Sequence, residues 1–154
     1  MIKINLPGQG ELEFKHLILD FNGTLAVDGK LLLGVKTKLQ KISENIAIHI
    51  LTADTFGTVK SQLSDFQIKI LSSDEQSFQK ADYIQKLGAD ECISIGNGFN
   101  DHKMIKISKL GIVVIQKEGA HSKTLIAADI VCTDINSALE LLDNPNRLIA
   151  TMRN

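Results

Sequence analysis

The sequence has little that would place it in a membrane or on a nucleic acid. No apolar stretch approaches the roughly 18 residues that a membrane span needs, and the opening MIKINLPGQG lacks the long apolar segment of a signal peptide. Its 17 basic residues are balanced by 18 acidic ones, for a formal net charge of −1. Without a basic surplus, we expect no partner among nucleic acids or anionic membranes.

Cysteine and proline are scarce, with two of each. Cys92 and Cys132 lie in separate short apolar runs, as is typical of buried free thiols in a reducing cytoplasm. Pro7 and Pro145 lie near the ends, and no linker, repeat or low-complexity tract lies between them. The 154 residues, 44% of them hydrophobic, are enough for one domain with a real core. We therefore expect a single cytoplasmic domain over residues 1–154.

Extended and helical patterns alternate along most of the chain. Strands are predicted over residues 2–6, 11–21, 46–53, 68–72, 92–96, 111–116 and 129–133. Helices are predicted over residues 35–45, 55–66, 77–88, 100–110, 121–128 and 135–143. Ser73 or Ser77 is a candidate N-cap for the third helix, and Asp28-Gly29 is a two-residue hairpin signal. This alternation predicts a three-layer, Rossmann-like α/β fold with a mostly parallel sheet and an N-terminal β-hairpin.

Polar residues follow several of the predicted strands. They are Asp20, Thr52, Lys80 and the segment 96–101. In parallel sheets, ligands bind beyond the carboxyl ends of the strands. These features, which are separate in sequence, are therefore expected to converge in space. Alone, Asp20 reads equally well as a turn former, so the convergence is the reason to treat it as functional.

Four ordered motifs resemble those of the haloacid dehalogenase superfamily. They are Asp20-Phe21-Asn22-Gly23-Thr24, then Thr52, then Lys80, and finally Gly96-Asn97-Gly98-Phe99-Asn100-Asp101. The last is similar to the Gly-Asp-Gly-x-Asn-Asp motif of P-type ATPases, so the chain most resembles soluble proteins similar to their phosphorylation domain. Gly96-x-Gly98 also approaches a dinucleotide fingerprint, but the third glycine is absent.

The resemblance implies a role for each matching residue. Catalytic residues would be Asp20 as the nucleophile, Asn22, Thr52 and Lys80. Phosphate contacts would come from Gly23, Thr24, Thr52, Ala53, Lys80, Gly98 and Asn100. Magnesium ligands would be Asp20, Asn22 (through its backbone carbonyl), Asn97 and Asp101. Lys86 is a rival to Lys80 but lies further along its helix, away from the strand ends. A simpler alternative is that Asn100 or Asp101 only caps the following helix.

Two positions depart from the family pattern. Most phosphatases of the superfamily carry an aspartate as acid/base at the position of Asn22, and an amide cannot exchange a proton at neutral pH. Losing such a group typically costs about 10²–10⁴ in rate. Asn97 replaces an aspartate of the metal site, so magnesium affinity should also fall.

Short intervals between the motifs leave no room for a cap domain, and the Asp28-Gly29 hairpin is the one evident lid. The resemblance implies a magnesium-dependent phosphohydrolase that acts on a phosphorylated small molecule or macromolecule through phospho-Asp20, slowly because of Asn22. One alternative is a regulatory module that binds phosphate or a phosphoprotein with attenuated chemistry. Another is a phospho-accepting assembly protein, a homo-oligomer whose interface replaces the cap.

Overall fold

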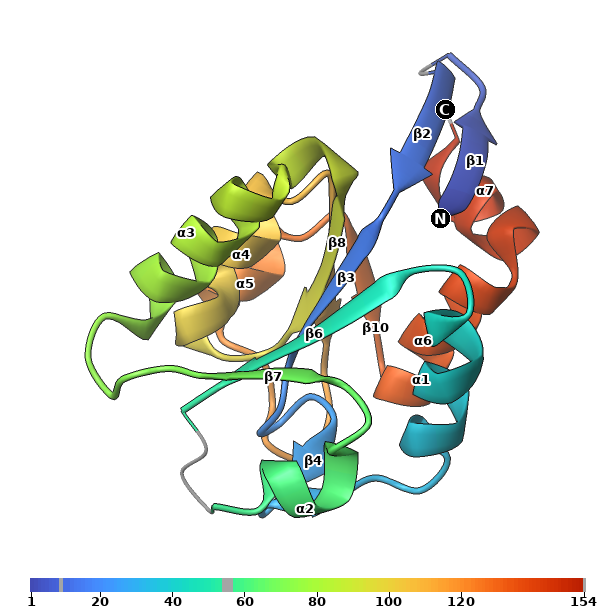
Figure 1. Ribbon diagram of the computed structural model, residues 1–154. Coiled ribbons are helices and arrows are strands. Elements are labelled where there is room, and N and C mark those ends of the chain that lie inside the picture. Colours follow the sequence, from blue (N-terminus) through green and yellow to red (C-terminus); the bar gives the residue numbers. More distant parts are fainter. Residues whose placement is uncertain (9, 54–56, 154) are drawn as a thin grey trace.

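A central parallel sheet organises the computed structural model, which describes residues 1–8, 10–53 and 57–153. Its six strands run in the order β10-β9-β8-β3-β6-β7 (Figure 1). Their bounds are β3 (His16–Asp20), β6 (Ala47–Thr52), β7 (Gln67–Ile70), β8 (Cys92–Gly96), β9 (Leu110–Val114) and β10 (Ile130–Cys132). The predicted α/β class and parallel sheet are confirmed.

The strand order creates a switch point beside β3. From β3 the chain builds outward through β6 and β7, and it then returns to the other side of β3 to build β8, β9 and β10. Leu19 of β3 pairs with Ile50 of β6 and with Ile95 of β8. Ligands in open α/β sheets bind in the crevice at such a reversal, beyond the carboxyl ends of the strands. Asp20 ends β3 at this crevice.

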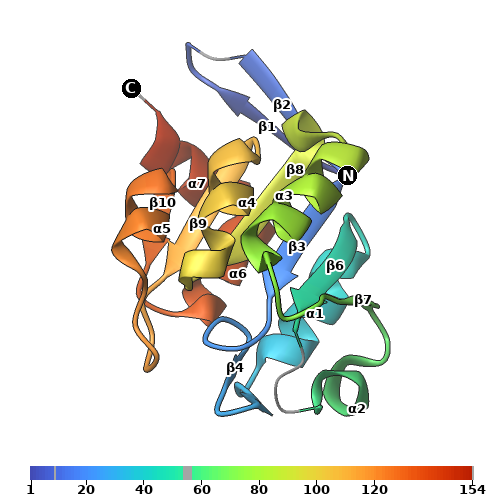
Figure 2. The same ribbon diagram turned by 90° about the vertical axis from the view of Figure 1, so that its left-hand side faces the viewer.

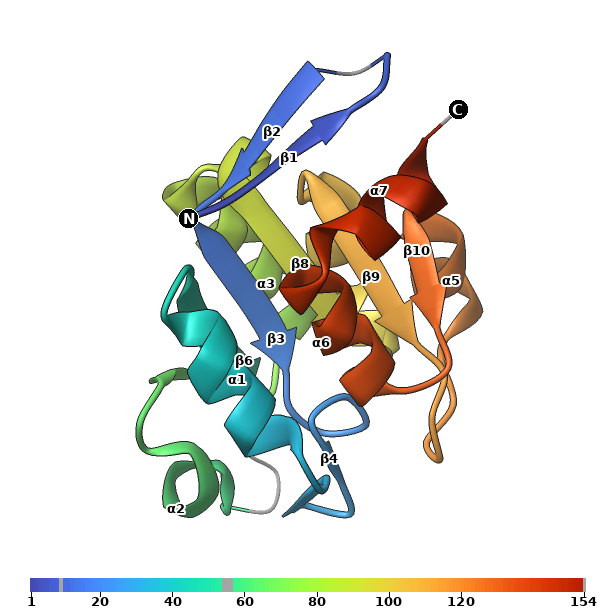
Figure 3. The ribbon, with the colours of Figure 1, turned by 90° about the vertical axis from the view of Figure 1, so that its right-hand side faces the viewer.

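Helices cover both faces of the sheet, which gives three layers (Figures 1, 2 and 3). One face carries α1 (Val35–Ser43), α6 (Ile135–Asp143) and α7 (Pro145–Met152), and Figure 3 shows this side. The other face carries α3 (Gln76–Leu87), α4 (His102–Ile107) and α5 (Ser122–Ala127), which face the viewer in Figure 2. A short helix, α2 (Val59–Leu63), packs beside β7, and two 3₁₀ turns are η1 (Ala89–Glu91) and η2 (Phe99–Asp101).

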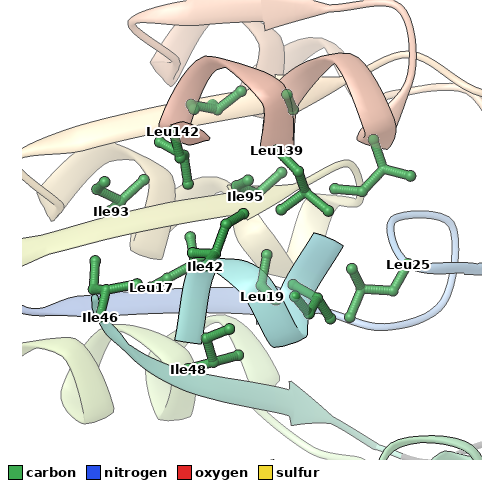
Figure 4. Close-up of a cluster of buried hydrophobic side chains, with 14 of the residues drawn as sticks. Leu17, Leu19, Leu25, Ile42, Ile46, Ile48, Ile93, Ile95, Leu139 and Leu142 are labelled. Carbon is green, nitrogen blue, oxygen red and sulfur yellow. The ribbon is translucent and has the colours of Figure 1, made fainter. Parts of the chain in front are cut away.

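The larger core lies between the sheet and the α1/α6 layer. Leu17 and Leu19 of β3 contribute to it with Ile95 of β8, and Leu139 of α6 and Ile42 of α1 contribute from the helix layer (Figure 4). Ile18 points the opposite way into a second cluster under α3 and α4. Because both faces of β3 are buried, the strand appears in the sequence as a continuous apolar run and shows no alternation.

Two hairpins flank the sheet. Strands β1 (Ile2–Leu6) and β2 (Gly10–Phe14) pair in antiparallel fashion and pack on α7, which confirms the N-terminal hairpin. Strands β4 (Ala26–Val27) and β5 (Lys30–Leu31) flank the predicted Asp28-Gly29 turn. Both turn residues have positive φ angles, 50° and 73°, as a type I′ turn requires.

Several predicted boundaries are wrong. The strand predicted over residues 11–21 is divided at Lys15, because β2 pairs with β1 whereas β3 pairs with β6 and β8. Helix α7 was not predicted, although Pro145 occupies its first turn, where a proline is well tolerated. Neither Ser73 nor Ser77 caps α3, whose N-cap is Glu75 in a left-handed conformation.

Two other helices are shorter than predicted. The helix expected over residues 100–110 is found as η2 followed by α4, and its end is taken up by β9. The helix expected over residues 55–66 is found as α2, and residues 54–56 lie outside the described part of the chain. No helix among the described residues combines the length and the apolar character that a membrane span requires.

Candidate active site

Three charged side chains meet beneath the carboxyl edge of the sheet. Lys80, on α3, places its Nζ 2.6 Å from Asp20 Oδ1 and 2.6 Å from Asp101 Oδ1. Lys80 and Asp101 are fully buried, and Asp20 is only 5% exposed. A helix, a strand end and a 3₁₀ turn that are far apart in sequence are thus joined by one lysine. The predicted convergence of these segments is found in the structure.

One lysine cannot neutralise two buried carboxylates, and the pKa values reflect this. Burial raises the pKa of Asp20 to about 7, and the charge of Asp101 adds to the rise, although Lys80 and Thr24 oppose it. Burial also disfavours the charged form of Lys80, but Asp101 and Asp20 outweigh it and raise the pKa of the lysine above its ordinary value. The lysine therefore stays charged, and the excess of negative charge contributes to the raised pKa of Asp20.

Asp101 holds the loop after β8 in place. Its Oδ2 accepts hydrogen bonds from the backbone N–H groups of Asn97 and Gly98, both at 2.9 Å. A Cβ on Gly96 would lie 2.6 Å from Asp101 Cγ, so this position requires glycine. Both carboxylate oxygens of Asp101 are thus bonded to protein donors. Asp101 lies behind the pocket as the partner of Lys80, and its expected role as a magnesium ligand stays a prediction from the motif.

The loop after β3 packs closely against the loop after β8. Thr24 Oγ1 lies 3.2 Å from Asp20 Oδ2 and 3.2 Å from Asn97 Oδ1. Gly23 has a φ of 81°, and a Cβ at this position would meet Asn97 Nδ2 at 2.4 Å. Asn97 Nδ2 in turn donates to the carbonyl of Gly119 at 2.9 Å. Gly23 and Thr24 therefore shape the nucleophile loop without lining the pocket.

A pocket of about 240 Å³ opens over Asp20. Its lining consists of Asp20, Asn22, Thr52, Ala53, Gln76, Asn97, Gly98, Asn100 and Glu118. Seven of these nine are predicted site residues. Lys80, Asp101, Gly23 and Thr24, which were also predicted, lie behind the pocket wall. Larger hollows elsewhere, such as the one between the N-terminal strand and α1, contain none of the predicted residues.

Two pocket residues, Gln76 and Glu118, were missed from the sequence. Gln76 begins α3 and accepts a hydrogen bond from Asn100 Nδ2 at 2.7 Å. It precedes Lys80 by four residues, so helical spacing places both on the same face and could have revealed it. Glu118 lies in the loop after β9, and the rule on carboxyl ends of strands could have indicated that loop as well.

The surroundings of Lys80 and Lys86, the two candidates for the motif lysine, differ in the structure. Lys86 pairs with Asp82 on the surface of α3, where both side chains are more than 60% exposed. Lys80 alone of the two contacts Asp20. His49, which reads from the sequence as a strand residue, lies in β6 and is hydrogen-bonded between His16 and Tyr83, at 3.0 and 2.9 Å.

The pocket wall is rich in oxygen donors suited to a hard cation. Asp20, Asn22 and Asn97, which carry carboxylate and amide groups, are among the residues that line the pocket. Asn22 Oδ1 is buried and has no hydrogen-bond partner among the described residues. Within the same residues, no group of three His, Cys, Asp or Glu side chains is placed to hold a metal. The donors thus fit an oxygen-liganded cation such as magnesium, with few carboxylates among them.

Solved structures that share this fold include proteins named as phosphatases and as hydrolases of the haloacid dehalogenase superfamily. The 3-deoxy-D-manno-octulosonate 8-phosphate phosphatase of Moraxella catarrhalis, solved with magnesium, phosphate and KDO, is 21% identical and has a TM-score of 0.68, covering 90% of this chain and 92% of that one. A subfamily III A hydrolase of Legionella pneumophila is 19% identical and has a TM-score of 0.66, and the match covers 90% of this chain and 87% of that one. A cobalt-bound phosphatase of Haemophilus influenzae is 15% identical and has a TM-score of 0.62, and the match covers 91% of this chain and 90% of that one.

The chain thus has the haloacid dehalogenase fold, as the motifs predicted. The finer likeness to the P-type ATPases stays a prediction from the motifs alone. No family model matches the sequence.

Two sequence relatives come from Methanocaldococcus jannaschii. The uncharacterized protein MJ0073 is 59% identical over 61 residues, which span 40% of this chain and 66% of that protein. The uncharacterized protein MJ0072 is 51% identical over 39 residues, which span 25% of this chain and 89% of that protein. The chain belongs to the same family as MJ0072, whose name states no activity.

Proposed function

We propose that the chain is a magnesium-dependent phosphohydrolase that works through an aspartyl phosphate on Asp20, with residues 1–154 as one catalytic domain. The observation that carries the proposal is the buried Asp20–Lys80–Asp101 cluster beneath a pocket at the switch point of the sheet. Strongly perturbed titratable groups in a cleft are typical of active sites. Fold neighbours that are named as phosphatases support the same reaction class.

In this mechanism Asp20 attacks the phosphorus of a bound phosphate ester while the bond from phosphorus to the ester oxygen breaks, and the departing alkoxide takes a proton from water. Lys80 holds Asp20 in position and favours its ionised form, which opposes the rise in pKa that burial causes. Thr52 and Asn100, on the pocket wall, would bind the phosphate oxygens through a hydroxyl and a side-chain amide, and Gly98, which has no side chain, would let the loop backbone come close to the phosphate.

Asp20, Asn22 and Asn97 are the residues that would hold the magnesium ion. When bound, the ion would offset the negative charge of phosphate beside a carboxylate. Because Asp20 is the one carboxylate among these three residues, we expect weaker affinity than at sites with more carboxylate ligands. Isothermal titration calorimetry with magnesium tests this expectation, and nanomolar affinity would contradict it.

Phosphate release from a broad panel of phosphate esters, with and without magnesium, tests the proposed activity. We expect slow, magnesium-dependent turnover that is lost in Asp20→Asn. Asp65→Asn, which removes a surface carboxylate that pairs with Lys36, serves as the matched control. Turnover that survives in Asp20→Asn would refute the proposal.

A phosphate-binding regulatory module is the second candidate function. It is favoured by the two asparagines, Asn22 and Asn97, that occupy pocket positions where the family pattern has aspartates. Under this alternative, a phosphate analogue such as vanadate binds and the ester panel shows no turnover. Turnover on the panel would rule it out.

A further inference from the structure

Glu118 brings a second carboxylate to the pocket that contains Asp20. Among the described residues, Asp20 and Glu118 are the two acidic side chains that line it. Asn22, at the position where the family pattern has an acid/base, lines the same pocket. The cavity measures about 240 Å³, and the exposed Glu118 lines it together with the buried Asp20.

The loop that carries Glu118 is fastened to the nucleophile loop. Gln116 Nε2 donates to the backbone carbonyls of Gly23 and Thr24 at 3.0 and 2.8 Å. From the other side, Asn97 Nδ2 donates to the carbonyl of Gly119 at 2.9 Å. Residues on both sides of Glu118 are therefore bonded to the loops that form the pocket.

A hydrogen bond from the backbone also holds the side chain of Glu118. Its Oε1 accepts the backbone N–H of Asp28 at 3.3 Å, from the turn between β4 and β5. Figure 3 shows that this hairpin and the orange loop after β9 both lie beyond the carboxyl edge of the sheet. Among the described residues, none donates a hydrogen bond to the second oxygen, Oε2. This oxygen can therefore accept a hydrogen bond from a water molecule.

We propose that Glu118 is the general base for hydrolysis of phospho-Asp20, in place of the aspartate that Asn22 replaces. A water oxygen would form the new bond to phosphorus while the bond from phosphorus to Asp20 breaks and its electron pair returns to the Asp20 carboxylate. The water proton passes to the Glu118 carboxylate and then to solvent. Inorganic phosphate leaves, and both carboxylates are restored. This inference rests on the proposed function.

The lifetime of the phosphoryl adduct tests this role. Wild type and Glu118→Gln would be loaded with acetyl phosphate and magnesium, rapidly desalted, and followed by intact-protein mass spectrometry. Glutamine can still accept the Asp28 N–H, so the loop contact is preserved while the base is removed. Removal of a general base typically slows a step by about 10²–10⁴, and we expect the adduct on Glu118→Gln to outlast the wild-type adduct by about 10²-fold or more.

Two further variants make the test specific. Glu44→Gln changes an exposed glutamate next to α1 and should leave the adduct lifetime unchanged. Asn22→Asp restores a carboxylate at the usual position, so adding Glu118→Gln to it should prolong the adduct far less than in wild type. Equal lifetimes in wild type and Glu118→Gln would overturn the inference while leaving Asp20 as the nucleophile. Absence of both adduct and phosphate release in every variant would instead refute the proposed function and this inference with it.

Discussion

Replacing Lys80 with methionine would leave Asp20 and Asp101 facing each other in the interior without a cation. Lys80 is 0% exposed and lies 2.6 Å from each carboxylate. Breaking a buried ion pair by removing one partner costs about 3–5 kcal/mol, because an uncompensated charge stays buried. For a domain of this size, 1 kcal/mol corresponds to about 2–4 °C in Tm. We therefore expect Lys80→Met to lower the melting temperature by roughly 6–20 °C.

Lys86→Met is the matched control. Lys86 lies on the same helix and also pairs with an aspartate, Asp82, but both side chains are exposed. Exposed pairs contribute about 0–1 kcal/mol, so this variant should melt close to wild type. Because the chain has no tryptophan, thermal and urea unfolding should be followed by far-UV circular dichroism. Equal destabilisation by the two substitutions would refute the reasoning.

The pH dependence adds a second check on the same cluster. The pKa of Asp20 is raised to about 7, chiefly by burial, so the folded state binds a proton on Asp20 that the unfolded state releases nearer pH 4. At pH 5 the protonated Asp20 no longer repels Asp101. The loss of stability in Lys80→Met should therefore be smaller at pH 5 than at pH 8, and a larger loss at pH 5 would contradict this account.

Other predictions test different parts of the structure. In the Glu118→Gln background, Asn22→Asp should speed release of phosphate from the adduct by about 10²-fold or more, because it restores a general base that this background lacks; an unchanged rate would show that a carboxylate at residue 22 does not serve as that base. Gly23→Ala should cost more stability in urea unfolding than Gly8→Ala: both residues have positive φ, but only at Gly23 would a Cβ clash, at 2.4 Å from Asn97. Burial lowers the pKa of His49 to about 4. Its contribution to stability is therefore complete above about pH 6.5, the ordinary value, and is lost as pH falls toward 4. The stability difference between wild type and His49→Gln should shrink over that interval, and a constant difference would contradict the shift.

The sequence predicted the part of the site that depends on local pattern and sheet topology. Asp20 and Thr52 end neighbouring parallel strands, and the carboxyl ends of such strands meet at one edge. Lys80 could be preferred over Lys86 because it lies nearer the start of α3, and the start of that helix faces the same edge. These inferences need only periodicity and strand direction.

The remainder depends on contacts between distant segments. Nothing in the local sequence indicates that both oxygens of Asp101 are taken by Lys80 and by two backbone amides. Gln76 and Glu118 enter the pocket from a helix start and a loop that carry no motif. The division between β2 and β3 was missed for a similar reason, because one apolar run supplies both strands and only their pairing partners separate them.

Intact-protein mass spectrometry after incubation with acetyl phosphate and magnesium tests the central claim most directly. Wild type, Asp20→Asn and Asp65→Asn would be compared, with phosphate release assayed on the same samples. The account predicts a phosphoryl adduct on wild type and Asp65→Asn that peptide mapping assigns to Asp20, and none on Asp20→Asn. An adduct that persists in Asp20→Asn, or the absence of both adduct and phosphate release in wild type, would contradict the claim that Asp20 is a nucleophile.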